Sequence, residues 1–173
     1  MKKIAIVLLS MCTLSAVYCR AESFTHIFDE MARGGTLTFP YASSDYTVGE
    51  TDKVTYTCSD GGSFVLNGGA FCIALPAGRG VVQTSPTVEN LTRLVVTHNV
   101  ASKLTGVRIL ISTDNSTWTD ITSSDMFVPY AINAPMPAKG NYYLKIENSG
   151  SAIKFLSFHY AYSPCHCLRV VSE

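Results

Sequence analysis

Charged side chains are scarce in this chain. Lysine and arginine contribute 13 residues and aspartate and glutamate another 13, so charged residues make up 15% of the 173 and the formal net charge is zero. No basic run or stripe is present to neutralise phosphates, and we therefore expect no nucleic-acid partner. Intrinsic disorder is not expected either, because 47% of the residues are apolar.

Long apolar runs are absent except at the N-terminus. Lys2 and Lys3 precede the segment IAIVLLSMCTLSA at 4–16. A basic start followed by about a dozen apolar residues is typical of a secretory signal peptide and is too short to span a bilayer. We predict no membrane span and a secreted or cell-surface location, in the periplasm or outside the cell.

The predicted signal peptide occupies 1–21. Cleavage is expected after Ala21, with Ala16 as the alternative, because small residues are required before the cut. The remaining chain is long enough for one domain with a sizeable core. We predict a β-sandwich domain at 22–163 and a C-terminal tail at 164–173.

Amphipathic helical patterns are also nearly absent. A 3.6-residue period occurs only at 24–33, where we expect a short helical turn, with an edge strand as the alternative. The rest consists of short alternating or β-branched runs, such as KVTYTC at 53–58, separated by Gly, Pro, Asn and Asp. Parallel sheets require crossover segments that this chain lacks. We predict an all-β fold, an antiparallel two-sheet β-sandwich of jelly-roll topology with a short N-terminal helical turn.

Six cysteines are present, two of them within the predicted signal peptide. An even number in an exported chain favours disulfides. Cys58 and Cys72 flank a glycine-rich segment, and we predict a disulfide between them. The other two belong to Cys165-His166-Cys167, for which we favour a solvated tail or a disulfide to the body over a metal site, because three adjacent ligands do not readily face one ion.

Catalytic motifs are missing. The chain contains no G-x-S-x-G, no H-E-x-x-H and no phosphate-binding loop. We therefore predict that it is not an enzyme and has no catalytic residue, metal site or cofactor. Two alternatives stay open: a structural calcium ion held by loop carboxylates, and a small hydrolase or lyase that uses a pair of scattered carboxylates. The carboxylates concerned are Asp45, Glu50, Asp52 and Asp60.

The single tryptophan follows a polar turn. In the segment STDNSTW at 112–118, Asp114 and Asn115 are predicted to accept backbone N–H groups of the turn. Trp118 is predicted to fill the core behind this turn.

Tyrosines near polar loop residues are the candidate ligand contacts. Tyr41, Asp45 and Tyr46 lie in the loop PYASSDYTVGE, and Tyr130 lies before a turn predicted to begin at Asn133. An aromatic ring can pack against the C–H groups of a sugar while carboxylate and amide groups bond its hydroxyls. These five residues are the predicted carbohydrate contacts.

Five short segments carry a resemblance to a known family. In chain order they are GVVQTSPTV at 80–88, LTRLVVT at 91–97, VRILISTDNSTW at 107–118, YYLKIEN at 142–148 and AIKFLSFHY at 152–160. Their order resembles the galactose-binding-like β-sandwich modules of secreted bacterial polysaccharide-degrading proteins, such as those associated with pectate lyases. The resemblance implies a jelly-roll and an ancillary role in glycan capture, and it carries over no binding residue.

The function predicted from the sequence is thus a secreted, non-catalytic module that binds carbohydrate. The alternative is an envelope or surface protein that binds another protein through an exposed strand edge.

Overall fold

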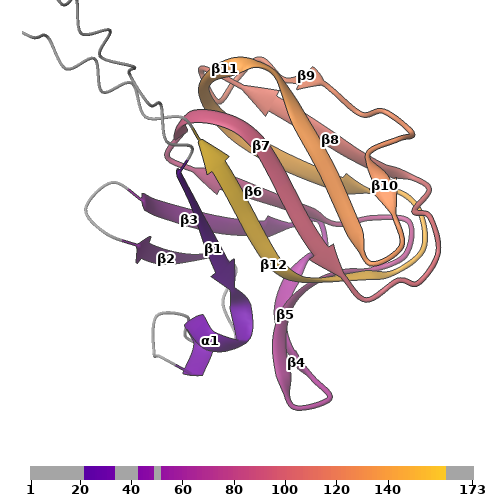
Figure 1. Cartoon of the computed structure of the whole chain (residues 1–173). Coiled ribbons are helices and arrows are strands. Elements are labelled where there is room, and N and C mark those ends of the chain that lie inside the picture. Colours follow the sequence, from indigo (N-terminus) through magenta and orange to yellow (C-terminus); the bar gives the residue numbers. More distant parts are fainter. Residues whose placement is uncertain (1–21, 34–42, 49–51, 163–173) are drawn as a thin grey trace, which may run out of the picture.

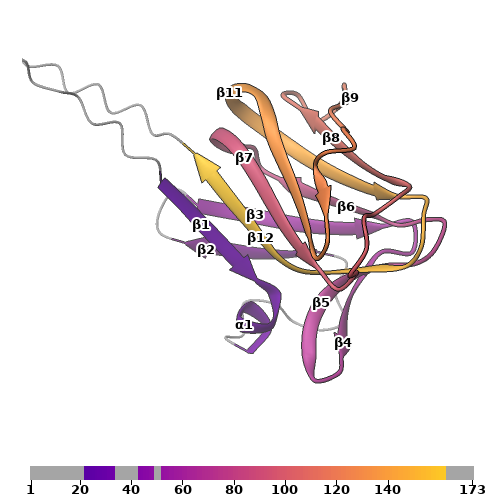
Figure 2. The ribbon, with the colours of Figure 1, turned by 45° about the vertical axis from the view of Figure 1, so that its right-hand side comes forward.

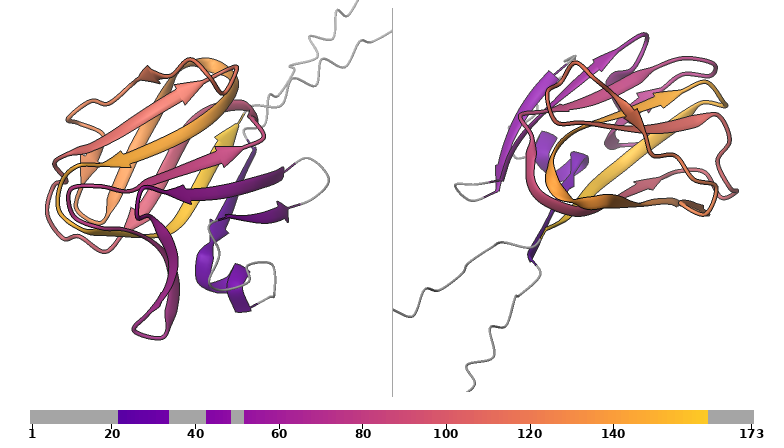
Figure 3. Two further views of the ribbon diagram at one scale, coloured as in Figure 1. Left: turned by 180° about the vertical axis from the view of Figure 1, so that it is seen from behind. Right: turned by 90° about the horizontal axis from the view of Figure 1, so that it is seen from above.

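The computed structural model describes residues 22–33, 43–48 and 52–162. These residues form twelve strands and one short helix, arranged as two antiparallel sheets that pack face to face (Figures 1 and 3). The elements are β1 (Glu22–Ile27), α1 (Phe28–Arg33), β2 (Ser43–Val48), β3 (Asp52–Ser59), β4 (Ser63–Asn67), β5 (Ala70–Leu75), β6 (Val81–Ser85), β7 (Val88–His98), β8 (Val107–Ser112), β9 (Thr119–Asp120), β10 (Phe127–Val128), β11 (Ala131–Asn148) and β12 (Ile153–Tyr162).

One long strand, β11, belongs to both sheets. Its first part, from Ala131 to Tyr142, pairs with β7 in the first sheet. Its second part, from Tyr143 to Asn148, pairs with β8 and, in part, with β6 in the second sheet. The register shifts on either side of Gly140, where the strand passes from one sheet to the other. The first sheet has the order β4-β5-β12-β7-β11-β10, with β1 also on β12, and the second has the order β2-β3-β6-β11-β8-β9.

The strand order identifies the topology. The first sheet contains β5-β12-β7-β11 and the second contains β6-β11-β8-β9. Most strands that follow one another in sequence therefore lie in opposite sheets, as in a jelly-roll. The predicted antiparallel jelly-roll sandwich with one short N-terminal helix is confirmed.

The N-terminal segment contains both of the expected elements, first an edge strand and then a short helix. β1 pairs with the edge of β12, placing Phe24 opposite Tyr160, and the helix begins only at Phe28. An open edge of β12 supplies backbone partners for β1, whereas the apolar residues Phe28 and Met31 turn into the core from α1.

The turn predicted to begin at Asn133 is wrong. Residues 131–148 form one strand that includes Pro135 and Pro137. Proline lacks the N–H that a central strand requires, so it is confined to edges and irregularities. Between Ile132 and Tyr143 the side of β11 that faces away from β7 has no paired strand among the described residues, and the prolines lie in that edge segment.

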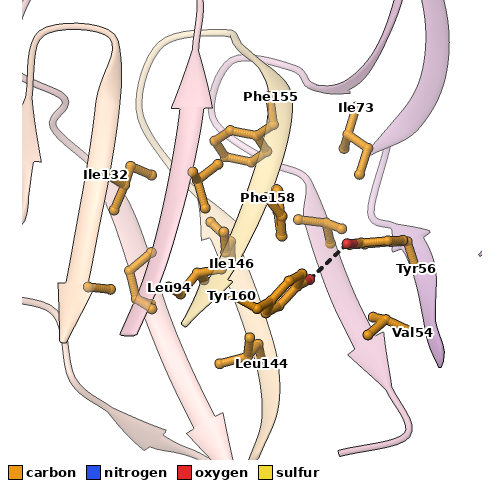
Figure 4. Packing of buried hydrophobic residues seen from close by; sticks show 14 of the residues in the cluster. Val54, Tyr56, Ile73, Leu94, Ile132, Leu144, Ile146, Phe155, Phe158 and Tyr160 are labelled. Atoms are coloured by element: carbon orange, nitrogen blue, oxygen red, sulfur yellow. Dashed lines mark hydrogen bonds between the residues drawn. The ribbon is translucent and has the colours of Figure 1, made fainter. Parts of the chain in front are cut away.

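The core between the sheets combines aliphatic side chains with a group of aromatic rings (Figure 4). Phe28, Tyr56 and Phe158 contact one another edge to face, with ring centroids 5.2 to 5.5 Å apart. Each fully buried ring of this kind contributes roughly 1.5–3 kcal/mol through burial alone. The two sheets are therefore held together mainly by apolar packing.

The predicted disulfide between Cys58 and Cys72 is wrong, because both thiols are free. Cys58 of β3 points into the core, whereas on β5 it is Ile73 that joins the core. Side chains alternate along a strand, so Cys72 points away from the core and from Cys58. Burial raises the pKa of Cys58 to about 12 and also raises that of Cys72.

The predicted signal peptide at 1–21 and the whole predicted tail at 164–173, with Cys165-His166-Cys167, lie outside the described residues. Among the residues that the structure does describe, no helix has the length and apolar character needed to cross a bilayer.

Candidate functional site

Those of the five predicted contacts that the structure describes do not lie together. Tyr41 lies outside the described residues; Asp45 and Tyr46 lie on the edge strand β2, and their side chains are not described. Tyr130 is 57% exposed and has a left-handed backbone with φ of 64°, and Asn133 is exposed on β11 nearby. β2 and the turn before β11 lie at opposite edges of the sandwich (Figures 1 and 2). Whether any of the five contacts a ligand stays a prediction.

A different group of aromatic and polar side chains gathers on the outer face of the second sheet. Along β6, β8 and β11, alternate residues enter the core and the others point outward. Pairing aligns the outward positions in rows, with Lys145 opposite Gln83 and Glu147 opposite Arg108. We call this surface the outer platform. It consists of Gln83, Arg108, Asn115, Trp118, Asp120, Tyr143, Lys145 and Glu147.

Trp118 lies on the outer platform and not in the core, so its predicted position is wrong. The ammonium nitrogen of Lys145 is 3.9 Å from the centroid of the indole ring, a cation–π contact. The ring is only half-buried and is not part of the core cluster. The reason is the return path of the chain after β8, which crosses the outward surface of its own sheet before β9 begins.

The turn before Trp118 is held by one carboxylate. Oδ1 of Asp114 accepts the backbone N–H of Ser116 at 2.9 Å and of Thr117 at 2.8 Å, and also the hydroxyl of Ser112 at 2.9 Å. The predicted role of Asp114 in accepting backbone N–H groups is thereby confirmed. These hydrogen bonds, the two backbone ones first, hold the pKa of Asp114 far below its usual range.

Asn115 fixes the turn to a more distant strand. It adopts a left-handed backbone with φ of 61°, and its side-chain oxygen accepts a hydrogen bond from Nε2 of Gln83 at 2.7 Å. Gln83 belongs to β6, and the turn leaves from β8, so this bond spans the intervening strand β11. Asn115 and Trp118 therefore both lie over the row that contains Gln83 and Lys145.

Charged groups on the outer platform are organised around one guanidinium. Nε of Arg108 donates to Asp120 at 2.9 Å, and Nη1 donates to Glu147 at 3.2 Å. The side chains are between about one third and one half exposed, so each pair contributes little to stability, typically 0–1 kcal/mol. Their effect is to hold two carboxylates and a guanidinium in fixed positions on the surface.

A depression lies at one end of the outer platform, where β6, β8 and β11 meet the adjoining turns. It has a volume of about 410 Å³ and is lined by the side chains of Asp60, Arg79, Arg108 and Glu147 among others. This volume falls within the range of small-ligand sites, roughly 300–1,000 Å³. The platform thus offers an aromatic ring, amide groups and charged hydrogen-bonding groups next to a hollow.

The arrangement is suited to binding more than to acid–base chemistry. The hydrogen bonds from Thr122, and then that from Arg108, lower the pKa of Asp120, which favours its ionised form over a proton-donating one. Among the described residues, no group of three or more His, Cys, Asp and Glu side chains is arranged to hold a metal ion.

Sequence reasoning missed most of this platform. The alternating segments that supply Lys145, Glu147 and Arg108 are recognisable as strands, and neighbouring residues of a strand, such as Tyr142 and Tyr143, point to opposite faces. Tyr142 is indeed buried and Tyr143 half-exposed. Nothing in the sequence, however, indicates that the turn carrying Trp118 folds back over these positions.

Comparison with known proteins gives structural likenesses at low identity. No family model matches the chain, and no curated protein does. A family 29 carbohydrate-binding module in complex with cellulohexaose is 16% identical, with a TM-score of 0.46 over 82% of this chain and 92% of the module. A xylan-binding module of family 86 from Roseburia intestinalis is 7% identical, with a TM-score of 0.36 over 61% of this chain and 93% of that one.

A family 2 carbohydrate esterase from Cellvibrio japonicus is 10% identical, with a TM-score of 0.44. The match covers 83% of this chain but only 35% of the esterase. Because all three TM-scores lie below 0.5, we base the function on the residues of this chain.

Proposed function

We propose that this protein is an exported, non-catalytic carbohydrate-binding protein whose ligand lies across the outer platform. The observation that carries the proposal is the position of Trp118. A large aromatic ring normally contributes most when it is buried in a core. Here the only tryptophan of the chain lies on the surface, set in place by Lys145 on the strand below and by the turn that Asp114 holds.

The neighbouring groups match the chemistry of sugars. A sugar hydroxyl both donates and accepts, so it is best bound by acceptors and donors placed side by side. Glu147 and Asp120 supply acceptors, and Arg108 and Gln83 supply donors, within the same two rows. An indole face adjacent to these groups offers an apolar surface for the C–H groups of a sugar ring.

The alternative function, protein–protein association through a strand edge, has one observation in its favour. β4 is an outer strand of the first sheet, paired only with β5 among the described strands, and Leu66 on it is 54% exposed. Unprotected apolar edges can pair with another chain. This surface lies on the β4–β5 hairpin, which extends away from the sandwich (Figures 1 and 2), so the two functions can be tested with separate variants.

Affinity electrophoresis and calorimetry with soluble cello-, xylo- and galacto-oligosaccharides test the proposal. Trp118→Ala is expected to weaken binding by about 2 kcal/mol, or roughly thirty-fold in Kd, as for an aromatic residue at the centre of an interface. Tyr130→Ala is the competing variant, because it removes an exposed ring that the sequence predicts as a sugar contact at another edge of the sandwich. Loss of binding in Tyr130→Ala with none in Trp118→Ala would place the site elsewhere and overturn the proposal.

Export and an ancillary role in polysaccharide use are parts of this proposal that rest on the sequence. N-terminal sequencing of protein recovered from the cell envelope or medium tests the first. A new N-terminus at Glu22 or Val17 supports export, and an intact Met1 in the cell interior contradicts it.

A further inference from the structure

Two charged side chains in the depression of the outer platform are engaged by no other group. Asp60 and Arg79 both line it. Among the described residues, neither side chain takes part in a hydrogen bond or ion pair, with each other or with a third residue. Arg108 and Glu147, which line the same depression, are by contrast bonded to each other.

The backbone that carries Arg79 is fixed by the neighbouring hairpin. The N–H of Gly78 donates to the carbonyl of Gly150 at 2.7 Å, and the side-chain amide of Asn148 donates to the carbonyl of Pro76 at 2.7 Å. The turn between β5 and β6 is therefore tied to the turn between β11 and β12. Arg79 is presented from a braced turn, which lowers the entropy that a ligand must remove on binding.

Asp60 is presented by a second tight turn, between β3 and β4. Its backbone is left-handed with φ of 49°, and the N–H of Gly62 closes the turn on the carbonyl of Ser59 at 2.9 Å. A Cβ atom at Gly61 would lie 3.1 Å from Nε of Arg79, so the two turns are in contact. The acid and the guanidinium thus approach the depression from adjoining turns without bonding to each other.

Charge decides which ligand suits this pair. Arg108 is already bonded to Asp120 and Glu147. A negatively charged ligand in the depression would therefore have Arg79 as its cationic partner. A uronic acid would place its carboxylate in the depression that Asp60 also lines, and these two like charges would repel each other. Two neighbouring hydroxyls of an uncharged sugar instead donate to Asp60 and accept from Arg79, which satisfies both groups.

We propose that Asp60 and Arg79 form a subsite for an uncharged sugar unit with two neighbouring hydroxyls, and that this subsite selects neutral glycans against uronic-acid glycans. The inference rests on the proposed carbohydrate binding at the outer platform. It assigns a specificity to one end of that platform, whereas the aromatic contact at Trp118 accepts either class.

The experiment compares the full-length wild-type protein with Asp60→Asn and Arg79→Gln by calorimetry. The probes are cello-, xylo- and galacto-hexaose and, as charged counterparts, hexamers of galacturonate and glucuronate. Asparagine tolerates the left-handed backbone at position 60, so Asp60→Asn changes charge with little strain. Arg93→Gln and Asp125→Asn are the matched controls: Arg93 lies on the outer face of the first sheet, and Asp125 in the segment between β9 and β10.

Wild type is expected to bind a neutral hexaose and to bind the uronates at least tenfold more weakly. Each of the two variants loses about tenfold or more in affinity for the neutral ligand, since hydrogen bonds to charged groups contribute roughly 1.5–3 kcal/mol. Asp60→Asn additionally reduces the ratio of the affinity for the neutral hexaose to the affinity for the uronates, because it removes the carboxylate that repels a uronate. The control variants leave both affinities unchanged.

The outcomes separate this inference from the proposed function. If no hexamer binds to any variant, carbohydrate binding itself is wrong. If a neutral hexaose binds in a Trp118-dependent manner and neither variant weakens it, only the subsite is wrong. A wild-type preference for uronates also overturns the subsite, whichever residue causes it.

Discussion

The phenol oxygens of Tyr56 and Tyr160 lie 2.8 Å apart in the interior and join the second sheet to the first (Figure 4). Nδ1 of His26, on β1, lies 2.5 Å from the same Tyr56 oxygen. All three side chains are fully buried. If Tyr160 donates to Tyr56 and Tyr56 donates to neutral His26, both hydroxyl protons have an acceptor. This hydrogen-bond network is then uncharged although it lies in the core.

Unequal losses are expected when the two hydroxyls are removed separately. Tyr56→Phe eliminates both hydrogen bonds, and Tyr160→Phe eliminates only one. Each buried polar group that loses its partner costs about 1–3 kcal/mol. Urea denaturation should therefore show a larger decrease in the free energy of unfolding for Tyr56→Phe. An equal or smaller decrease than for Tyr160→Phe would show that the network does not pass through Tyr56.

Acid should destabilise the protein through His26. Burial lowers its pKa from 6.5 to about 3, and its ring contacts are the aromatic rings of Phe24, Tyr56 and Tyr160. Between pH 6.5 and about pH 3, His26 is protonated in the unfolded chain and neutral in the folded protein. The free energy of unfolding then falls as the pH is lowered from about 6.5 towards 3, by up to about 1.4 kcal/mol per pH unit, and this contribution is absent above pH 6.5.

His26→Gln supplies the reference for that measurement. Carboxylates with lowered pKa values, such as Asp29 and Asp120, also lose stability in acid, but they do so in both proteins. The difference between wild type and His26→Gln, followed by urea denaturation from pH 7 to pH 4, isolates the histidine. Parallel curves over this range would contradict its assignment as a buried neutral group.

Asp114 is expected to act on ligand binding through Trp118. Asp114→Ala removes the acceptor of two backbone N–H groups in the turn, so the indole ring is no longer held over Lys145. We expect the affinity for glycan to fall by about tenfold or more, and Asp114→Asn, which keeps an acceptor oxygen, to recover part of it.

Two readouts distinguish this positioning role from a general loss of structure. Tryptophan fluorescence should shift to longer wavelength in Asp114→Ala, because Trp118 is the only such residue. Asp125→Ala, which removes another exposed carboxylate that accepts a nearby serine hydroxyl, should leave fluorescence and affinity unchanged. A change in melting temperature without a change in fluorescence would count against the assigned role.

Cys58 and Cys72 should be found as thiols in the purified protein. Both are buried and their pKa values are raised, so alkylation of the native protein is expected to be slow. Unfolding without a reductant, followed by alkylation and peptide mapping, should show a label on both residues. A peptide pair linked through these two cysteines would require a different packing of β3 or β5.

The fold class and much of the local structure follow from the pattern of amino acids along the chain. Alternation of period two separates the inward and outward residues of each strand, which is why the neighbours Tyr142 and Tyr143 lie on opposite faces. Turn chemistry is equally local, and the role of Asp114 follows from its own neighbours in the chain. The absence of amphipathic helices then left a two-sheet sandwich as the way to bury the apolar face of each strand.

Which faces of the strands meet, and which side chains cover them, depends on contacts between distant segments of the chain. A strand pattern shows that Cys58 has an inward side, but not that Cys72 points away from it on the other sheet. It likewise does not show that Trp118 returns over Lys145, or that Asp60 and Arg79 meet from different turns. These relations depend on pairing between distant segments, and periodicity along one strand contains no information about the partner, its register or the path of the connecting loop.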